Sequence, residues 1–373
     1  MVSKKILVVS DVIFPWSIGG AEERYQNIAS GYPMGDYELH FATVRWVSGE
    51  TPPNYFFISK KSSIYNNNKK RSIFSSIAFS MATLKILKLK FDVIEANQIP
   101  IIHLFPLWLV SRIKRVPFTV TWHEVWSKED WEKYSPRYAI FAHALSRMAA
   151  HLPDKIISVS EFSKRKLIAQ GIEEVQVTVI EHQINMHEIE VSQTQLNGTD
   201  FLYVGRLIHH KRVDLLLEAF ATVLVSYPYV TLGIVGEGPE YENLVKLAQM
   251  AKISHAVTFF GKLQDKRDVF ALIKKSKAFV TASEREGYGI AVAEAIAAGI
   301  RVIVSSASEN AAQYLVRDGT DYIFDSGNSE NLSMKMVEII RNPMQKAIID
   351  QELKSVSISN QYFSIWKSLV EDA

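Results

Sequence analysis

The sequence predicts an α/β protein made of two doubly wound parallel sheets that follow one another along the chain. Short apolar runs suited to buried strands alternate with helical segments at intervals of roughly 20–40 residues, the spacing of strand–helix–strand units. A polar segment without periodicity, residues 183–198, interrupts this alternation and is expected to contain a linker. The length of 373 residues suits two domains, each with its own core.

The first alternating pattern begins with the apolar run 6–9, followed by a loop with Gly19 and Gly20 and a helix over 21–28. A strand, a glycine loop and a helix can hold an anion at the helix N-terminus. A tight turn that binds nothing is an equally good interpretation of so short a motif. Four later apolar runs are expected to extend this sheet: 92–96, 117–122, 156–159 and 177–180.

His123 directly follows the predicted strand 117–122. Polar side chains just beyond the carboxyl end of a parallel strand lie where ligands bind in such sheets. A structural histidine with its hydrogen bonds satisfied is the alternative, and the position favours the functional interpretation. Ser160 is expected to cap a helix that ends at Gly171.

A basic stretch, residues 51–91, contains no Asp or Glu. Within it, residues 73–89 combine apolar side chains and lysines at roughly helical spacing. An interfacial helix on anionic lipid has this pattern, as does a docking face for an anionic acceptor. A helix with a basic outer face is the alternative. The eight basic residues are Lys60, Lys61, Lys69, Lys70, Arg71, Lys85, Lys88 and Lys90.

The second alternating pattern opens with a strand over 201–204, followed by Gly205, Arg206 and, after two histidines, Lys211. Two cations between a strand end and a helix start are well placed to meet a diphosphate, although solvated surface charge is the alternative. Later strands are predicted at 230–235, 257–260, 278–281, 302–304 and, at the edge, 322–324. Pro239, after the glycines of Gly236-Glu237-Gly238, is expected in the first turn of a helix.

The segment 281–306 is a strand, a polar turn, a small-residue helix capped by Gly299 and a second strand. The turn presents the amides of Gly287, Tyr288 and Gly289 at a helix start, where the helix dipole favours an anion. Glu286 and Glu294 are eight residues apart. On a helix this spacing corresponds to about two turns plus 80°, so both carboxylates are expected to border one crevice.

Composition narrows the possible functions. There are 42 basic and 40 acidic residues, and the resulting net charge of +2 argues against a nucleic-acid partner. No cysteine is present, which excludes disulfides and thiolate metal sites and fits a reducing compartment. The N-terminal apolar run is broken by Asp11 and is interpreted as a strand rather than a signal peptide. No apolar run reaches the roughly 18 residues that span a bilayer. A cytoplasmic protein is therefore expected, and a peripheral position on the inner face of the membrane is left open.

Taken together, the segments GGAE, VGRL with a downstream lysine, VGEGP and above all EGYGIAVAE resemble the retaining nucleotide-sugar glycosyltransferases of family 4, which have the GT-B fold. The last segment matches that family's signature of two glutamates separated by seven residues. The resemblance is strong over 201–324 and looser over the first 180 residues. It implies two Rossmann-like domains that face each other across a cleft: an acceptor-binding domain at 1–185, a donor-binding domain at 186–355, and a C-terminal helix at 356–373 that packs back on the first domain.

The resemblance also implies roles for individual residues. Arg206 and Lys211 would hold the donor diphosphate, Glu286 the sugar hydroxyls and Glu294 the ribose, while His123 would lie near the transferred sugar. The remaining residues expected at the donor site are Gly19, Gly20, Gly205, Gly236, Gly287, Tyr288, Gly289 and Ile290. The chain departs from the family pattern at 179–189, where VIEHQINMHEI replaces a common turn, and at Gln313 and Asp321.

The expected function is therefore retaining transfer of a hexosyl group from a UDP- or GDP-sugar to a glycan or lipid-linked acceptor. No metal and no cofactor are expected, because no Asp-x-Asp motif is placed to hold a metal and the nucleotide sugar is a substrate. Two alternatives remain: an epimerase or hydrolase of the same fold, or a partner subunit that binds a nucleotide without catalysis. The base, the sugar and the acceptor are not specified by these motifs.

Overall fold

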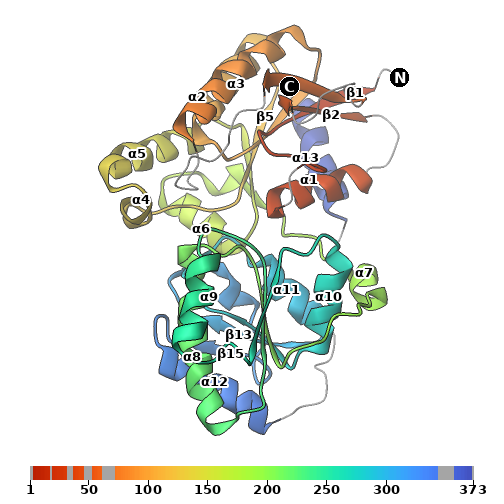
Figure 1. The fold of residues 1–373 in the computed structure, drawn as a ribbon. Helices are drawn as coiled ribbons and strands as arrows, with labels where there is room; N and C mark the ends of the chain where they lie inside the picture. The colour runs from red at the N-terminus through yellow and green to blue at the C-terminus, as the bar shows by residue number, and fades with distance from the viewer. Residues whose placement is uncertain are drawn as a thin grey trace. The chain divides into compact units, whose positions relative to one another are not determined.

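The computed structural model describes residues 3–16, 19–31, 37–45, 53–60, 72–342 and 357–371. The chain divides into two compact units, of which unit 1 contains Met1–Gln183 and Val356–Ala373 and unit 2 contains Ile184–Ser355. Each unit is built on its own parallel sheet covered by helices (Figure 1). The predicted fold class, an α/β protein with two doubly wound parallel sheets, is confirmed.

Unit 1 contains a sheet of seven parallel strands in the order β3-β2-β1-β4-β5-β6-β7. Two of them, β2 and β3, were not anticipated from the sequence. The strand β2 includes the buried polar residues His40 and Thr43, as the predicted strand β5 includes Thr119 and Thr121. The strands are β1 (Lys4–Val9), β2 (Tyr37–Arg45), β3 (Tyr55–Lys60), β4 (Val93–Asn97), β5 (Phe118–Trp122), β6 (Lys155–Ser158) and β7 (Val177–Val179).

Helices cover both faces of this sheet, because successive residues of a strand point to opposite faces. Ile6 and Val8 pack with residues of α1 and α13, whereas Leu7 and Val9 pack with residues of α2 and α3. The C-terminal helix α13 thus belongs to the core of unit 1. The helices are α1 (Gly20–Ser30), α2 (Ile73–Ala82), η1 (Thr83–Lys88), η2 (Ile101–His103), α3 (Leu104–Lys114), α4 (Lys128–Tyr134), η3 (Pro136–Tyr138), α5 (Ala139–Ala150), α6 (Glu161–Ala169), η4 (Glu174–Gln176) and α13 (Ile358–Glu371).

A buried polar network joins α1 and α13 to the sheet. Arg24 Nε donates to the Tyr362 hydroxyl at 2.6 Å, and that hydroxyl lies 2.7 Å from Thr121 Oγ1. Thr121 and Tyr25 both donate to Glu95 Oε1, at 2.6 and 3.2 Å. Burial raises the pKa of Glu95, and these hydrogen bonds oppose that effect. Because unpaired polar groups are costly in a core, the network specifies how α1 and α13 dock on the sheet.

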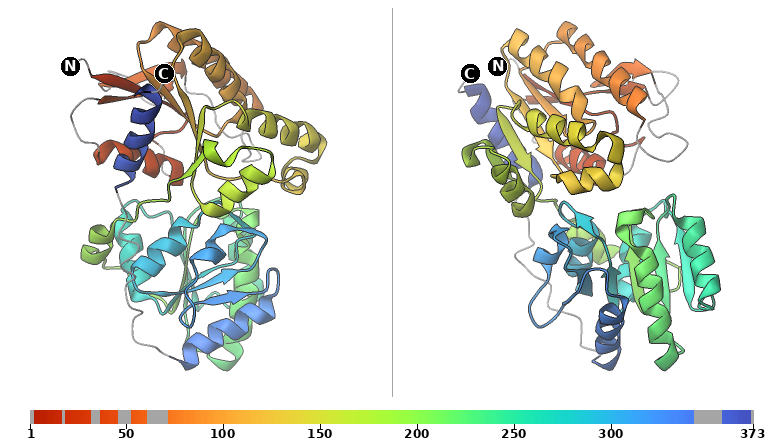
Figure 2. Two further views of the ribbon diagram at one scale, coloured as in Figure 1. Left: turned by 180° about the vertical axis from the view of Figure 1, so that it is seen from behind. Right: turned by 90° about the vertical axis from the view of Figure 1, so that its left-hand side faces the viewer.

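Unit 2 contains a sheet of six parallel strands in the order β10-β9-β8-β11-β13-β15, and β12 pairs with β14 in a small separate sheet. Helices α8, α9 and α12 contribute to one core together with the sheet (Figures 1 and 2). The strands are β8 (Phe201–Val204), β9 (Leu232–Val235), β10 (Val257–Gly261), β11 (Ala278–Thr281), β12 (Arg285–Glu286), β13 (Arg301–Ser305), β14 (Glu309–Asn310) and β15 (Tyr322–Phe324). The helices are α7 (Met186–Val191), η5 (His209–Lys211), α8 (Val213–Ser226), α9 (Tyr241–Met250), α10 (Lys266–Lys275), α11 (Ile290–Ala297), η6 (Ala311–Leu315) and α12 (Ser329–Arg341).

Several local predictions can be compared directly with unit 2. The strands β8, β11 and the edge strand β15 have the predicted bounds, and Gly299 has a positive φ of 74° just beyond α11, as a C-terminal cap requires. The prediction for Pro239 was wrong: α9 begins at Tyr241, so the proline precedes the helix. The polar segment 183–198 also contains a short helix, α7, and is not entirely a loop.

Candidate functional site

The candidate site of unit 2 lies at the point in the sheet where the strand order changes direction. Strand β8 is flanked by β9 on one side and by β11 on the other, and both pairs are parallel. Ligands of doubly wound folds bind outside the carboxyl ends of the strands at such a switch point. The loop after β8 carries Gly205, Arg206 and Lys211, and the loop after β11 carries Glu286 and Gly289. The predicted residues of unit 2 therefore leave the sheet at one edge.

Three contacts join the loop after β8 to the loop after β11. Lys211 Nζ lies 2.5 Å from Glu286 Oε1, and Arg212 Nη1 lies 2.8 Å from Glu284 Oε1. The backbone N–H of Glu284 donates to the carbonyl of His210 at 2.8 Å. Arg212 has a left-handed backbone with a φ of 50°, which is costly for any residue except glycine. The ion pair between Arg212 and Glu284 helps to hold both loops in place.

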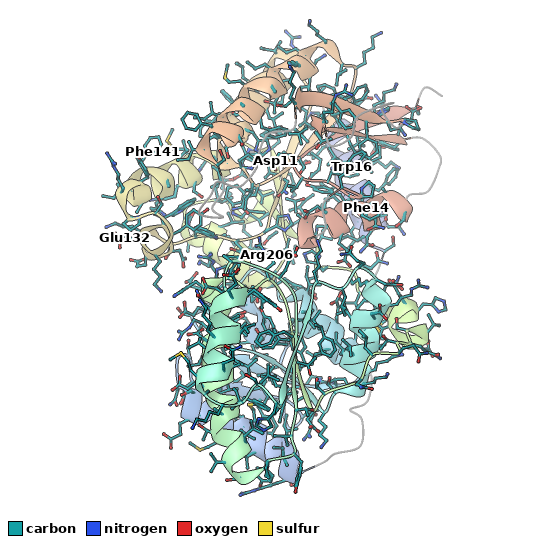
Figure 3. The ribbon with its side chains drawn as sticks, in the orientation of Figure 1. Asp11, Phe14, Trp16, Glu132, Phe141 and Arg206 are labelled. Carbon is teal, nitrogen blue, oxygen red and sulfur yellow. The ribbon has the colours of Figure 1, made fainter. Side chains whose placement is uncertain are left out.

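Positive charge is concentrated around this junction. Arg206 is exposed at the end of β8 (Figure 3) and makes no ion pair with a carboxylate in the part of the chain that the structure describes. Burial, together with the nearby cations Lys211, Arg285 and Arg206, lowers the pKa of His210 to about 2. His210 is consequently neutral at physiological pH. An anion placed here would be attracted by the same cations.

The glycines after β8 and β9 are explained by close packing of two backbones. A Cβ atom on Gly236 would lie 1.9 Å from the carbonyl oxygen of Gly205, and one on Gly238 would lie 2.2 Å from that of Leu207. Gly236 also has a φ of 137°, and the N–H of Leu207 donates to the carbonyl of Glu237 at 2.9 Å. These glycines hold the loop that carries Arg206. Their direct contact with a donor remains a prediction.

The second loop leads into α11 through Gly289, which has a φ of 100°. A Cβ atom at this position would lie 2.5 Å from Cβ of Ala312, so both conformation and space favour glycine. Tyr288 is buried, and Ile290 begins the helix. The N-terminus of α11 therefore opens at the switch point, with Lys211 and Glu286 in the adjoining loops.

The helical argument for Glu286 and Glu294 was wrong in one respect. Glu286 lies in β12, before α11 begins at Ile290, so helical spacing does not relate the two carboxylates. Glu294 is buried on α11, and its Oε1 lies 2.7 Å from Nζ of Lys266 on α10. Each of the two glutamates thus faces a lysine from another element. Lys266 was missed in the sequence because α10 lies far from the recognised motifs.

Unit 1 places His123 at the carboxyl end of β5. The backbone N–H groups of His123 and Glu124 donate to Gln98 Oε1 at 2.9 and 3.1 Å, so Gln98, which follows β4, positions this loop. Burial and the nearby Arg24 lower the pKa of His123 to about 3, and the imidazole is neutral at physiological pH. Its ring lies 6.4 Å from that of His182. Gln98 and Arg24 had no motif that would have singled them out.

Gly19 caps the N-terminus of α1 and Gly20 is the first residue of that helix, one residue before the predicted start. Gly19 is the N-terminal cap with an extended backbone, a conformation open to any residue, and a Cβ atom there would lie 2.7 Å from the Glu22 carboxylate. Glu22 and Glu23 occupy the first turn of the helix, where carboxylates are favoured by the dipole. A ligand phosphate at this N-terminus would have to compete with these negative charges.

Metal binding and membrane spanning can be examined for the described residues. Among them, no three His, Asp or Glu side chains are grouped so that they could hold a metal ion. In the same ranges, no helix combines the length and the apolar character needed to cross a membrane. Of the basic stretch, residues 61–71 lie outside the described ranges, including Lys61, Lys69, Lys70 and Arg71.

Comparison with known proteins shows which family of proteins the chain belongs to. A family model described as Glycosyltransferase Family 4 matches residues 18–188, and one described as Glycosyl transferases group 1 matches residues 186–355. The chain is thus a glycosyltransferase with the GT-B fold. It belongs to the family 4 type, and the predicted family and GT-B fold are confirmed.

Three similar proteins illustrate the range of relatives. An uncharacterized glycosyltransferase of Haemophilus influenzae is 25% identical over 335 residues, 88% of each chain. Alpha-monoglucosyldiacylglycerol synthase of Acholeplasma laidlawii is 30% identical over 142 residues, which cover 38% of this chain and 35% of that one. The crystal structure of Anabaena Alr3699/HepE in complex with UDP and glucose has a TM-score of 0.73 at 19% identity, and the match covers 98% of this chain and all of that chain.

Proposed function

We propose that the protein transfers a hexosyl group, with retention of configuration, from a UDP- or GDP-sugar to a glycan or lipid-linked acceptor. The observation that carries this proposal is the exposed Arg206 beside the Lys211–Glu286 pair at the switch point of unit 2. The complex of Alr3699/HepE with UDP and glucose supports a nucleotide-sugar donor. The name of the Acholeplasma relative supports a lipid among the possible acceptors.

The difficult part of such a transfer is the negative charge that develops on the leaving diphosphate. Arg206 and Lys211 are cations that could neutralise this charge, and the N-terminus of α11 adds the favourable end of a helix dipole. Because these groups are held by the surrounding loops, they need little rearrangement during the reaction. We propose that the chain supplies this stabilisation through its own cations and amides, without a divalent metal.

The two glutamates suit the hydroxyl-rich parts of the donor. Glu286 would accept hydrogen bonds from the sugar, and Glu294 would accept them from the ribose. Each carboxylate is paired with a lysine and keeps further oxygen lone pairs that can accept hydrogen bonds. His123, neutral because of its lowered pKa, would lie near the transferred sugar, and Gly19 and Gly20 near the phosphates, as the family resemblance implies.

Retention without a covalent intermediate requires departure and attack on one face of the sugar. The bond between the anomeric carbon and the β-phosphate oxygen breaks, and a bond from the same carbon to the acceptor oxygen forms. The acceptor proton passes to an oxygen of the departing phosphate. A covalent route would instead need a carboxylate nucleophile beside the anomeric carbon.

Variants at Arg206 and Lys211 test the proposal. Loss of one charge-stabilising donor typically lowers turnover by about 10²–10³-fold, so we expect Arg206→Ala and Lys211→Ala to lose most transfer while the fold is preserved. Lys277→Ala is the matched control, because Lys277 also pairs with a carboxylate, Asp200 at 2.8 Å, but at the amino end of β11. Near-normal turnover by the folded double variant would contradict the assignment.

Further measurements distinguish glycosyl transfer from the alternative functions. Titration calorimetry with UDP and with GDP identifies the base, and NMR of the product's anomeric proton establishes whether configuration is retained. Donor consumption that needs no acceptor would indicate a hydrolase or an epimerase. Nucleotide binding without turnover on any acceptor fraction would indicate a non-catalytic subunit, and loss of activity on chelation of divalent ions would contradict metal independence.

A further inference from the structure

Unit 1 has an outer face on which large apolar side chains are exposed. On α2 these are Phe74, Ile77 and Met81, at the spacing of one helical face, and Phe74 has 87% of its surface exposed. Trp108 and Ile113 are exposed on α3, and Phe141 on α5 is 68% exposed (Figure 3). Several large exposed apolar side chains on one face are typical of an interaction site.

These helices present their exposed residues on one side of the unit. Phe79 of α2, Leu107 of α3 and Ala149 of α5 belong to one core beneath them. The outward faces of the three helices, together with η1 after α2, therefore form one layer, which we call the α2–α3–α5 face. Figure 2 shows α2 and α3 running together along one face of the sheet of unit 1.

The charges of this face have one sign. The segments α2, η1, α3 and α5 contain no Asp or Glu, and they carry Lys85, Lys88, Arg112, Lys114 and Arg147. Residues 51–123 contain eleven Lys or Arg and two Asp or Glu, whereas the whole chain is nearly balanced. Of the two acids, Glu95 is buried in the network of unit 1, and Asp92 accepts a hydrogen bond from the backbone of Lys5 in β1. Arg112 pairs with Asp154 at 2.6 Å, whereas Lys85, Lys88, Lys114 and Arg147 have no carboxylate partner among the described residues, so these four cations supply the free positive charge of the face.

We propose that the α2–α3–α5 face docks on an anionic lipid bilayer. Apolar side chains interspersed with cations suit the boundary between acyl chains and anionic headgroups: the apolar groups enter the acyl region, and the cations pair with the headgroups. Charge complementarity favours lipid over a second copy of this chain, because two such basic faces would repel one another. The inference extends the proposed function, since a lipid-linked acceptor would be presented at this surface.

Vesicle flotation of the full chain tests the docking without any assay of transfer. We expect binding to vesicles of phosphatidylcholine mixed with phosphatidylglycerol, little binding to phosphatidylcholine alone, and weakening as salt is raised. Phe74→Ser combined with Phe141→Ser should lower the partition coefficient at least about tenfold. Lys88→Gln should lower it about fivefold, the effect of one cation near such a surface.

A matched control comes from unit 2, where Val225 and Tyr229 are exposed to a similar extent. The variant Val225→Ser with Tyr229→Ser should float like the wild type. Titration with UDP should be unchanged in all variants, which shows that they are folded and separates failure of docking from failure of the proposed function. Equal flotation of all variants, or no flotation of the wild type, would overturn the proposal. Concentration-dependent dimers that disappear with Phe74→Ser, without vesicle binding, would overturn it in favour of self-association.

Discussion

At the scale of single residues, His123 shows how the fold controls a protonation state. Its imidazole is enclosed near Arg24 and His182, and burial together with Arg24 lowers its pKa to about 3 from an ordinary value of 6.5. Between these values the unfolded chain binds a proton that the folded chain excludes. The contribution of neutral His123 to stability is therefore complete above about pH 6.5 and is lost as the pH falls toward 3.

We predict that His123→Asn reduces the sensitivity of the protein to acid. Between about pH 7 and about pH 5, the wild type should lose about 2 kcal/mol more free energy of unfolding than this variant, since each pKa unit corresponds to about 1.4 kcal/mol. Urea unfolding at several pH values measures the difference. His151→Asn, at an exposed histidine, should run parallel to the wild type. If His123→Asn also runs parallel, His123 is not excluded from protonation.

At the scale of elements, the loops after β8 and β9 depend on the contact between Gly236 and Gly205. Gly236→Ala would bring a Cβ atom to 1.9 Å from a backbone carbonyl, which cannot move aside as a flexible side chain can. We expect a loss of at least about 3 kcal/mol in the free energy of unfolding. We also expect UDP affinity to fall at least about tenfold, because the displaced loop carries Arg206.

Gly319→Ala is the control for this substitution. Gly319 also has a positive φ, 73°, but no atom lies within 4 Å of the position of its Cβ. Its replacement should cost only the conformational strain, about 1 kcal/mol, and should leave UDP affinity unchanged. Chemical denaturation and calorimetry measure both quantities. Equal costs at Gly236 and Gly319 would show that backbone contact between the loops does not explain the glycine.

The same elements show what could be predicted from the sequence. The largely apolar strands β8 and β11 have the predicted bounds, whereas β2 and β3 were not predicted. At the candidate site, short motifs singled out Arg206, Lys211 and Glu286, and their roles stay predictions. The partners that position such residues, Lys266 for Glu294 and Gln98 for the loop of His123, are distant in sequence and follow from tertiary packing alone.

At the scale of the whole molecule, the chain returns at its C-terminus to the unit in which it began. Trp366 of α13 is fully buried in the core of unit 1, and Phe220 of α8 is fully buried in that of unit 2. Each side chain supports its own core, and replacing a buried aromatic residue with alanine typically costs about 3–5 kcal/mol. Hydrogen exchange measured by mass spectrometry reports the two units separately, peptide by peptide.

We predict that Trp366→Ala raises exchange in β1 and β4, whereas Phe220→Ala raises it in β8 and β11. UDP at about a hundred times its dissociation constant should stabilise the site that binds it by about 2.7 kcal/mol. If the nucleotide site lies in unit 2, UDP should still slow hydrogen exchange in the loops after β8 and β11 of the Trp366→Ala variant. The reason is that this substitution destabilises the core of unit 1 and not that of unit 2. Loss of this protection in Trp366→Ala, at a UDP concentration that protects the wild type, would mean that nucleotide binding also requires an intact unit 1.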